Sequence, residues 1–253
     1  MTFFFDRYIQ PFLLAYIQPR ILEVGASEGD HSELLLGIPG SKVTIIDPCL
    51  DKPLDEIYGS NDRARVVKKI SLDALLSVDG KYDAILIDGD HNWYTVYHEL
   101  LEIEKHDLLA PNGVIFFHDV SWPYGRRDMY YQPELIPQEH RQPHARKGII
   151  QGTSPLSNND GLNAFHYNAE AEGGEKNGVL TAIEDFVKRG APQYLLFTVN
   201  EENGLGVVVR ASDPSARSAF DRLVAYRKAE LKKAALRSRF PWLYRAMKRL
   251  LGK

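Results

Sequence analysis

The sequence predicts an α/β fold with a doubly wound, Rossmann-like sheet of seven strands, mostly parallel and closed by a C-terminal antiparallel hairpin. Two observations support this prediction. Short apolar runs alternate with segments of helical spacing over the first 120 residues, as βαβ units require. Further along the chain, two apolar runs are separated by only five residues, which is enough for a hairpin alone.

Five apolar runs bounded by turn residues predict the parallel strands, at residues 20–24, 42–46, 65–69, 82–87 and 114–117. The run at 82–87 is almost continuously apolar, as expected of a strand that is buried on both faces. Helical spacing predicts helices at residues 29–36, 72–76, 92–108 and 179–189. The apolar start of the chain, interrupted by polar residues and Pro11, predicts another helix packed on the sheet.

The closing hairpin is expected from residues 194–199 and 205–210. A mostly parallel sheet that ends in one reversed strand is the arrangement of class I methyltransferases, whereas a plain dinucleotide-binding Rossmann fold normally lacks that strand. We therefore expect one such domain over residues 1–213, with an insert at 121–178, and a separate tail at 214–253.

Composition and charge restrict the class of protein. The chain is 44% hydrophobic and 26% charged, as globular proteins are, and its net charge of −3 gives no reason to expect nucleic acid as a partner. The single cysteine, Cys49, excludes an intramolecular disulfide and fits a reducing compartment. The apolar start lacks the basic region and cleavage site of a secretory signal and is too interrupted to span a bilayer. We expect a soluble, cytoplasmic protein.

The tail is strongly basic. Residues 227–253 contain ten Lys or Arg and one Glu, a net charge of +9, which leaves −12 for the rest of the chain. Helical spacing predicts amphipathic helices at 215–237 and 242–251. One interpretation is peripheral contact with an anionic membrane. The other, which we favour, is a solvated face or subunit packing in a homodimer.

The turn after the first strand has features of a cofactor site. Gly25 lets the backbone turn tightly, and Gly29 would let the helix start lie close to a ligand. The Gly-x-Gly-x-x-Gly pattern of pyrophosphate binding is absent because position 27 is Ser. Glu23 would repel phosphate but suits a cationic cofactor that carries an amino acid. These features favour S-adenosylmethionine over a nicotinamide dinucleotide, although a generic βα turn is the alternative.

Two more positions complete the expected cofactor site. Asp47 closes the second strand, where a carboxylate can bond both hydroxyls of a ribose. Ser71 follows the third strand, where it would either contact adenine or cap the next helix. The expected cofactor-binding residues are Glu23, Gly25, Ala26, Ser27, Gly29, Asp47, Ser71 and Asp88.

Polar clusters follow two central strands, Asp88-Gly89-Asp90-His91 after one and His118-Asp119 after the other. Ligands of open α/β sheets bind at the carboxyl ends of the strands, so these side chains should meet. Asp88, His118 and Asp119 then offer oxygen and imidazole ligands suited to Mg²⁺ or Mn²⁺. The alternatives are that Asp90 or Asn92 only caps the next helix and that His118 is a core histidine.

With its IDGDH and FHDV endings, the stretch 82–120 resembles the metal-dependent sugar O-methyltransferases of macrolide and aminocoumarin biosynthesis, and more distantly catechol O-methyltransferase. The resemblance covers residues 20–120 and, more loosely, the hairpin. It implies that Asp88, His118 and Asp119 hold Mg²⁺. His118 departs from the Asp-Asp or Asp-Asn pair of the relatives, so it either binds the metal or orients Asp119.

The same resemblance puts the general base two or three residues after Asp88, at Asp90 or His91. We favour His91, because the ordinary pKa of histidine is near neutrality, with the Asp90 carboxylate able to hold the imidazole. His144 is a reserve candidate if the insert folds over the site. The remaining histidines His31, His98 and His106 fall on predicted helices, and no chemistry is assigned to them.

The insert at 121–178 is too long and too poor in periodic apolar residues for an ordinary connection, which predicts a lid or binding loop. It mixes aromatic residues with amides and arginines, a combination that suits a carbohydrate better than a flat apolar phenol. A solvated excursion or dimer arm is the alternative.

Together these expectations describe an S-adenosylmethionine-dependent, divalent-metal-assisted O-methyltransferase. Its acceptor would be a small molecule or oligosaccharide, methylated on a sugar hydroxyl of a glycoside, polysaccharide or glycosylated natural product. The alternatives are a catechol-like phenol acceptor, a metal-dependent hydroxylase or oxidoreductase on a related fold, and a non-catalytic binding module.

Overall fold

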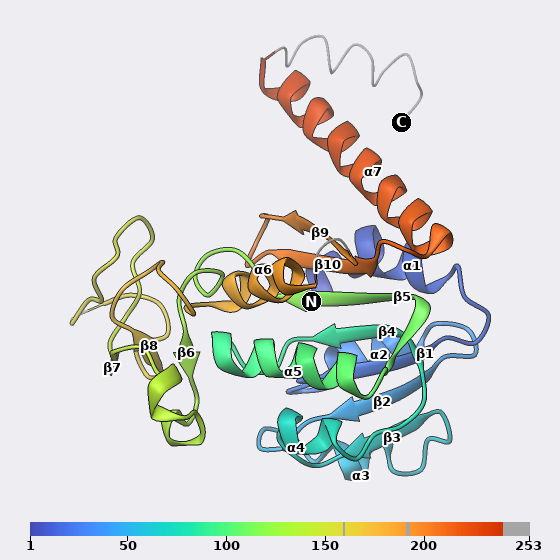
Figure 1. Cartoon of the computed structure of the whole chain (residues 1–253), viewed down its shortest axis with the longest axis horizontal. Helices are drawn as coiled ribbons and strands as arrows, with labels where there is room; N and C mark the ends of the chain where they lie inside the picture. Colours follow the sequence, from blue (N-terminus) through green and yellow to red (C-terminus); the bar gives the residue numbers. More distant parts are fainter. Residues whose placement is uncertain (159, 191–192, 240–253) are drawn as a thin grey trace.

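The computed structural model describes residues 1–158, 160–190 and 193–239 (Figure 1). Its main sheet has seven strands in the order β3-β2-β1-β4-β5-β10-β9. The first five strands in this order, β3, β2, β1, β4 and β5, are parallel to one another, while β10 runs antiparallel to both β5 and β9. The predicted doubly wound sheet and closing hairpin are therefore confirmed. The strand bounds are β1 Arg20–Val24, β2 Lys42–Ile46, β3 Ala64–Val67, β4 Tyr82–Ile87, β5 Leu109–His118, β9 Tyr194–Val199 and β10 Leu205–Arg210.

Helices cover both faces of this sheet (Figure 1). The N-terminal segment, α2, α3 and the start of α7 pack on one face, and α4, α5 and α6 pack on the other. In β4, Ile85 and Leu86 point to opposite faces and both are buried, which explains the continuous apolar run. The helix bounds are α1 Gln10–Leu13, α2 Asp30–Leu36, α3 Leu54–Tyr58, α4 Ser71–Leu75, α5 Trp93–Lys105, α6 Val179–Arg189 and α7 Pro214–Arg239.

The apolar start of the chain is helical and packed on the sheet, as expected. A 3₁₀ turn at Thr2–Phe4 and a π-helical turn at Phe5–Ile9 precede α1. Phe4 and Ile9 are fully buried in the core of that face. This arrangement brings the first residues of the chain to the carboxyl end of β4, where the N-terminal ammonium of Met1 lies 3.1 Å from Oδ2 of Asp88.

The insert forms a second, three-stranded sheet in the order β6-β8-β7, with β6 at Met129–Tyr130, β7 at His144–Arg146 and β8 at Tyr167–Ala169. Its attachment to the domain depends on the fully buried carboxylate of Asp128. Oδ1 of Asp128 accepts hydrogen bonds from the backbone N–H of Trp93 and of Gly178, at 2.7 and 2.6 Å. Asp128 thereby joins the insert to the first residue of α5 and to Gly178, the residue that precedes α6.

The helix α7 extends away from the domain (Figure 1). Its buried residues are Ala216, Phe220 and Leu223, all near its beginning, so the apolar stripe ends long before the helix does. The second predicted tail helix, at 242–251, lies outside the described residues. Among the described helices, none combines the length and the apolar character needed to cross a bilayer.

Glu99, on the buried face of α5, should make stability depend on pH. Burial raises the pKa of this carboxyl from 4.5 to about 8, so the folded protein keeps a proton that the unfolded chain releases. The stabilising contribution is complete below about pH 4.5 and is lost as the pH rises to about 8. Glu99→Gln should remove this decline, making the variant up to a few kcal/mol more stable than the native protein at pH 8.

Urea unfolding at pH 5, 6.5 and 8 would measure this difference. Glu56→Gln, an exposed change on α3, is the matched control and should follow the native protein at every pH. If the free energy of unfolding changes with pH in the same way for the native protein and for Glu99→Gln, the prediction is wrong.

Candidate active site

The turn after β1 packs directly against the turn after β4. Gly25 has a φ of +83°, and a Cβ atom there would lie 2.4 Å from the backbone oxygen of Asp88. A side chain is therefore excluded at Gly25 on both conformational and steric grounds. This close contact of the two turns brings the expected cofactor site next to the polar cluster that begins at Asp88.

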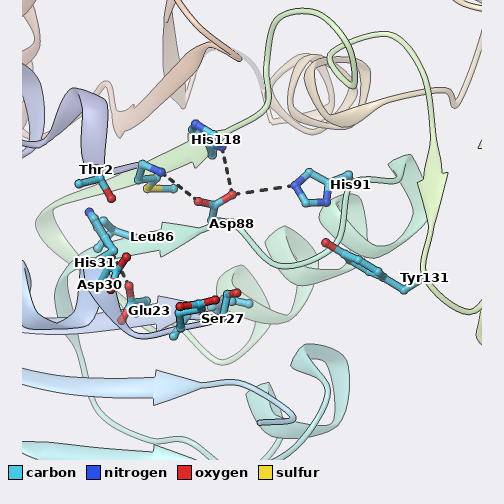
Figure 2. A pocket seen from close by; sticks show the side chains of 15 residues that line it. Thr2, Glu23, Ser27, Asp30, His31, Leu86, Asp88, His91, His118 and Tyr131 are labelled. Carbon is cyan, nitrogen blue, oxygen red and sulfur yellow. Dashed lines mark hydrogen bonds and ion pairs between the residues drawn. The ribbon is translucent and has the colours of Figure 1, made fainter. Parts of the chain in front are cut away.

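Two adjoining cavities of about 370 and 430 Å³ open at this edge of the sheet, within the size range of ligand pockets. Figure 2 shows the first cavity. Both are lined by Val24, Gly25, Ser27, Asp88 and Tyr131. The other expected cofactor residues are divided between them, with Glu23 and Ala26 in the first and Asp47 and Ser71 in the second.

Gly29 is the exception, because it lines neither cavity. A Cβ atom at Gly29 would lie 3.0 Å from the hydroxyl of Tyr58, which donates a hydrogen bond to the backbone oxygen of Gly29. The small residue thus allows α2 to start against α3. The expectation that Gly29 leaves room for a ligand is therefore corrected to a packing role.

Ser71 had two predicted roles, and the structure separates them. Ser71 is the first residue of α4, the N-cap is Ile70, and no side chain caps this helix. Ser71 instead lines the second cavity. Ser71 therefore lies where it could contact a bound ligand, as the adenine prediction requires, and the predicted capping role is wrong.

The carboxylate of Asp47 is buried and holds the turn. Oδ2 accepts hydrogen bonds from the backbone N–H of Ala26 and of Ser27, at 2.8 and 2.9 Å, and Oδ1 accepts one from Cys49 at 2.6 Å. Asp51 also lines the second cavity, where its carboxylate accepts a hydrogen bond from the Ser27 hydroxyl at 3.1 Å. If Asp47 binds a ribose hydroxyl, it does so through carboxylate oxygens that already accept hydrogen bonds from the backbone of Ala26, Ser27 and Cys49.

Asp88, His118 and Asp119 come together as the strand ends predict. Their potential ligand atoms all lie within 4.8 Å of one another. Nδ1 of His118 lies 3.2 Å from Oδ1 of Asp88 and 3.0 Å from Oδ2 of Asp119. Asp119, which follows β5, has a φ of +57°, a left-handed conformation that Asp tolerates better than most residues.

The electrostatics of this cluster favour bound cations. Burial alone would raise the pKa values of Asp88 and Asp119, but neighbouring imidazoles outweigh burial and hold both below the ordinary value. Burial likewise lowers the pKa of His118, but Asp88 and Asp119 outweigh it and raise that pKa to about 9. Asp88 and Asp119 are therefore ionised and lie close together, so positively charged groups are stabilised beside them.

His91 joins the cluster from the turn after β4. Its Nε2 lies 2.7 Å from Oδ2 of Asp119, and its Nδ1 is buried with no hydrogen-bond partner among the described residues. Burial lowers the pKa of His91, but Asp119 outweighs it, so the net direction is upward. The rings of Tyr124 and Tyr131 lie 5.3 and 6.0 Å from the imidazole, measured between centroids.

The expectation that Asp90 could hold the His91 imidazole is not met, because Asp119 does so. Asp90 accepts a hydrogen bond from the Thr95 hydroxyl at 3.0 Å and lines the second cavity. Asn92 is the cap of α5, since its Oδ1 accepts a hydrogen bond from the backbone N–H of Thr95 at 2.9 Å. Of the two proposed capping residues, Asn92 is therefore the correct one.

His144 lines neither cavity. It lies on β7, where its Nδ1 donates to the backbone oxygen of Gln142 at 2.8 Å and its ring contacts Tyr130 and Tyr167. The insert does reach the cavities, but it does so through other residues, including Tyr131 and Leu135. The reserve assignment of His144 as a base is therefore not supported.

Among the residues that line the cavities, sequence reasoning missed His31 and Asp51, and it named Tyr131 only as one of many aromatic residues of the insert. For His31 a signal existed, because it follows the cofactor turn by two residues. Asp51 follows the end of β2 by a few residues, which is a weak signal. Nothing in the sequence separates Tyr131 from Tyr130, which also lines the second cavity, because the fold of the insert decides which of them contacts His91.

Comparison with known proteins agrees with this geometry. Residues 22–120 match a family described as a methyltransferase domain, a stretch that ends just after the Asp88, His118 and Asp119 cluster. A search of curated protein sequences found no match.

Several solved structures are similar at low sequence identity. PaMTH1, a methyltransferase of Podospora anserina bound to SAH, is 16% identical over 77% of this chain and 72% of that one, with a TM-score of 0.47. A putative caffeoyl-CoA O-methyltransferase of Staphylococcus aureus is 18% identical over 76% of each chain, with a TM-score of 0.46. The 1,6-didemethyltoxoflavin-N1-methyltransferase of Burkholderia thailandensis is 15% identical over 84% and 81%, with a TM-score of 0.46.

Such identities carry no information about the substrate, and the fold is established by the strand order itself. That order, with its single reversed strand, accompanies the family match over the residues that form the candidate site. Together they support a class I S-adenosylmethionine-dependent methyltransferase.

Proposed function

We propose that the protein is an S-adenosylmethionine-dependent, divalent-metal-assisted O-methyltransferase that acts on a sugar hydroxyl of a glycoside, polysaccharide or glycosylated natural product. The observation that carries this proposal is a cavity at the Gly25 turn that Asp88, His91 and His118 also line, with Asp119 behind it holding both imidazoles. A methyl donor in the cavity would thus lie beside the groups able to activate an acceptor hydroxyl.

The donor set fits a divalent cation. Oδ1 of Asp119 is buried without a hydrogen-bond partner among the described residues, so this atom is available to a ligand. Asp88 and Asp119 would supply hard oxygen ligands, and His118 would supply a nitrogen or orient Asp119. When bound there, Mg²⁺ or Mn²⁺ would act as a Lewis acid that lowers the pKa of the acceptor hydroxyl.

His91 is proposed as the general base. The hydroxyl oxygen forms a bond to the methyl carbon as the bond from that carbon to sulfur breaks, which releases S-adenosylhomocysteine. The hydroxyl proton passes to Nδ1 of His91, the ring nitrogen without a partner in the described part of the chain, while Asp119 holds Nε2. Such a base typically contributes about 10² to 10⁴-fold to the rate.

The aromatic surroundings of His91 support a sugar acceptor. Tyr131 contacts the His91 ring, has 49% of its surface exposed and lines both cavities, so a ligand that enters them would meet it. Tyr124 also contacts the imidazole, but it is buried, lines neither cavity and accepts a hydrogen bond from Asn163 at 2.5 Å, so it supports His91 from behind. Rings that carry polar groups suit the mixed apolar and hydroxyl surface of a sugar.

Calorimetry with S-adenosylhomocysteine, followed by a radiolabelled methyl-transfer assay, tests the proposal. We expect binding of S-adenosylhomocysteine and transfer to glycosides that requires Mg²⁺ or Mn²⁺ and stops with EDTA. Transfer to catechols but not to glycosides would reject the sugar acceptor, and EDTA-insensitive transfer would reject the metal. Absence of cofactor binding would reject the proposed function altogether.

A further inference from the structure

His31, on the first turn of α2, has a buried nitrogen that no described residue satisfies. Its Nδ1 lies 2.9 Å from Oε1 of Glu23, while its Nε2 is buried with no hydrogen-bond partner among the described residues. The side chain is 11% exposed and lines the first cavity. Because an unpaired buried polar atom is destabilising, Nε2 is an atom that a ligand could satisfy.

The surroundings fix the His31 ring in this orientation. Glu23 is 2% exposed, and its second oxygen accepts a hydrogen bond from the Ser32 hydroxyl, so this carboxylate cannot swing away. The edge of the ring also contacts Phe5 of the N-terminal segment, with ring centroids 5.7 Å apart. Figure 2 shows His31 beside Glu23 and Asp30, on the far side of Asp88 from His91.

The charges that line the first cavity leave one kind of ligand group without a partner. Four acids line this cavity, Glu23, Glu28, Asp30 and Asp88, and its lining has no Lys or Arg within the described part of the chain. The N-terminal ammonium of Met1 also lines it but is paired with Asp88 at 3.1 Å. The amino-acid end of S-adenosylmethionine carries both an ammonium and a carboxylate. Acids can bind the ammonium, but the carboxylate needs a donor that can carry positive charge.

His31 can be that donor. The other two imidazoles of this cavity, His91 and His118, are paired with Asp119 at the methyl-transfer end. In the imidazolium form both ring nitrogens donate, so one His31 ring can bridge the Glu23 carboxylate and a ligand carboxylate. Nδ1 donates to Glu23, and Nε2 remains for the ligand.

We propose that His31, held by Glu23, is the residue that binds the carboxylate at the amino-acid end of the cofactor. This inference rests on the proposed function and adds a binding residue to it. Glu23, which the sequence predicts as a direct contact for a cationic cofactor, then acts largely through His31 as a positioning residue.

Calorimetry with two ligands tests this assignment. S-adenosylhomocysteine has the amino-acid end, and 5′-methylthioadenosine has the same nucleoside and sulfur without it. His31→Leu should bind S-adenosylhomocysteine about 10- to 100-fold more weakly, the range for a lost charge-assisted hydrogen bond, and bind 5′-methylthioadenosine like the native protein. Glu23→Gln should show a smaller loss in the same direction. Unchanged binding of 5′-methylthioadenosine also shows that each variant is folded.

His106→Gln is the matched control, because His106 bonds Glu102 on the protein surface, and it should bind both ligands like the native protein. Equal effects of His31→Leu on the two ligands, or no effect on either, would overturn the role of His31 while leaving the proposed function intact. A native protein that binds neither ligand would overturn the proposed function, and the inference with it.

Discussion

The Asp119→Ala variant should lose methyl transfer by about 10³-fold or more, since it removes both a proposed metal ligand and the partner of the base. Oδ2 of Asp119 accepts hydrogen bonds from His91 and His118, and its Oδ1 has no partner among the described residues. One substitution therefore weakens cation binding and releases two imidazoles. The measurement is kcat/KM with saturating S-adenosylmethionine over a range of Mg²⁺ concentrations.

Binding of S-adenosylhomocysteine to Asp119→Ala should change little, because Asp119 lines neither cavity. Asp62→Ala, an exposed change, serves as the matched control and should retain full activity. If Asp119→Ala keeps more than a tenth of native activity at ordinary Mg²⁺, the proposed metal site is wrong.

The second large effect is expected at His91. His91→Ala should lower kcat by about 10² to 10⁴-fold with little change in the KM for S-adenosylmethionine, because the imidazole is proposed to act on the acceptor proton alone. Single-turnover transfer in the presence of Mg²⁺ would measure the chemical step without product release. Full turnover by the variant under those conditions would reject His91 as the base, and the surface variant His106→Gln should behave as the native protein does.

Much of the fold was predictable because local pattern and tertiary structure agree. The β4 strand is apolar on both faces, so its run of residues marks the strand without any knowledge of its neighbours. Asp88 and Asp119 were predictable as a pair because parallel strands end at one edge of a sheet. The five-residue link between β9 and β10 allowed only one geometry.

The parts that could not be predicted depend on contacts between distant segments. The strands β6, β7 and β8 have two or three residues each, too few to show an alternation of apolar and polar residues. Asp128 fixes the position of this small sheet by bonding Trp93 and Gly178. That position decides that Tyr131 faces the site and His144 does not. The link between His31 and Glu23 spans the cofactor turn, and nothing in the spacing of the two residues predicts which ring nitrogen stays unpaired.

The attachment of the insert has a consequence for how acceptor preference can change. The backbone N–H of Met129 donates to the backbone oxygen of His91 at 2.9 Å, and Asp128 accepts from Trp93, which begins α5, and from Gly178, which precedes α6. Adjacent residues of the insert, Asp128 and Met129, thus bond the backbone on either side of α5's start, next to the proposed base His91. A chimera that receives a foreign insert without a carboxylate at position 128 should disturb the proposed base His91. If the insert binds the acceptor as proposed, new substrate ranges should arise by changes at its tip and not by exchange of its root.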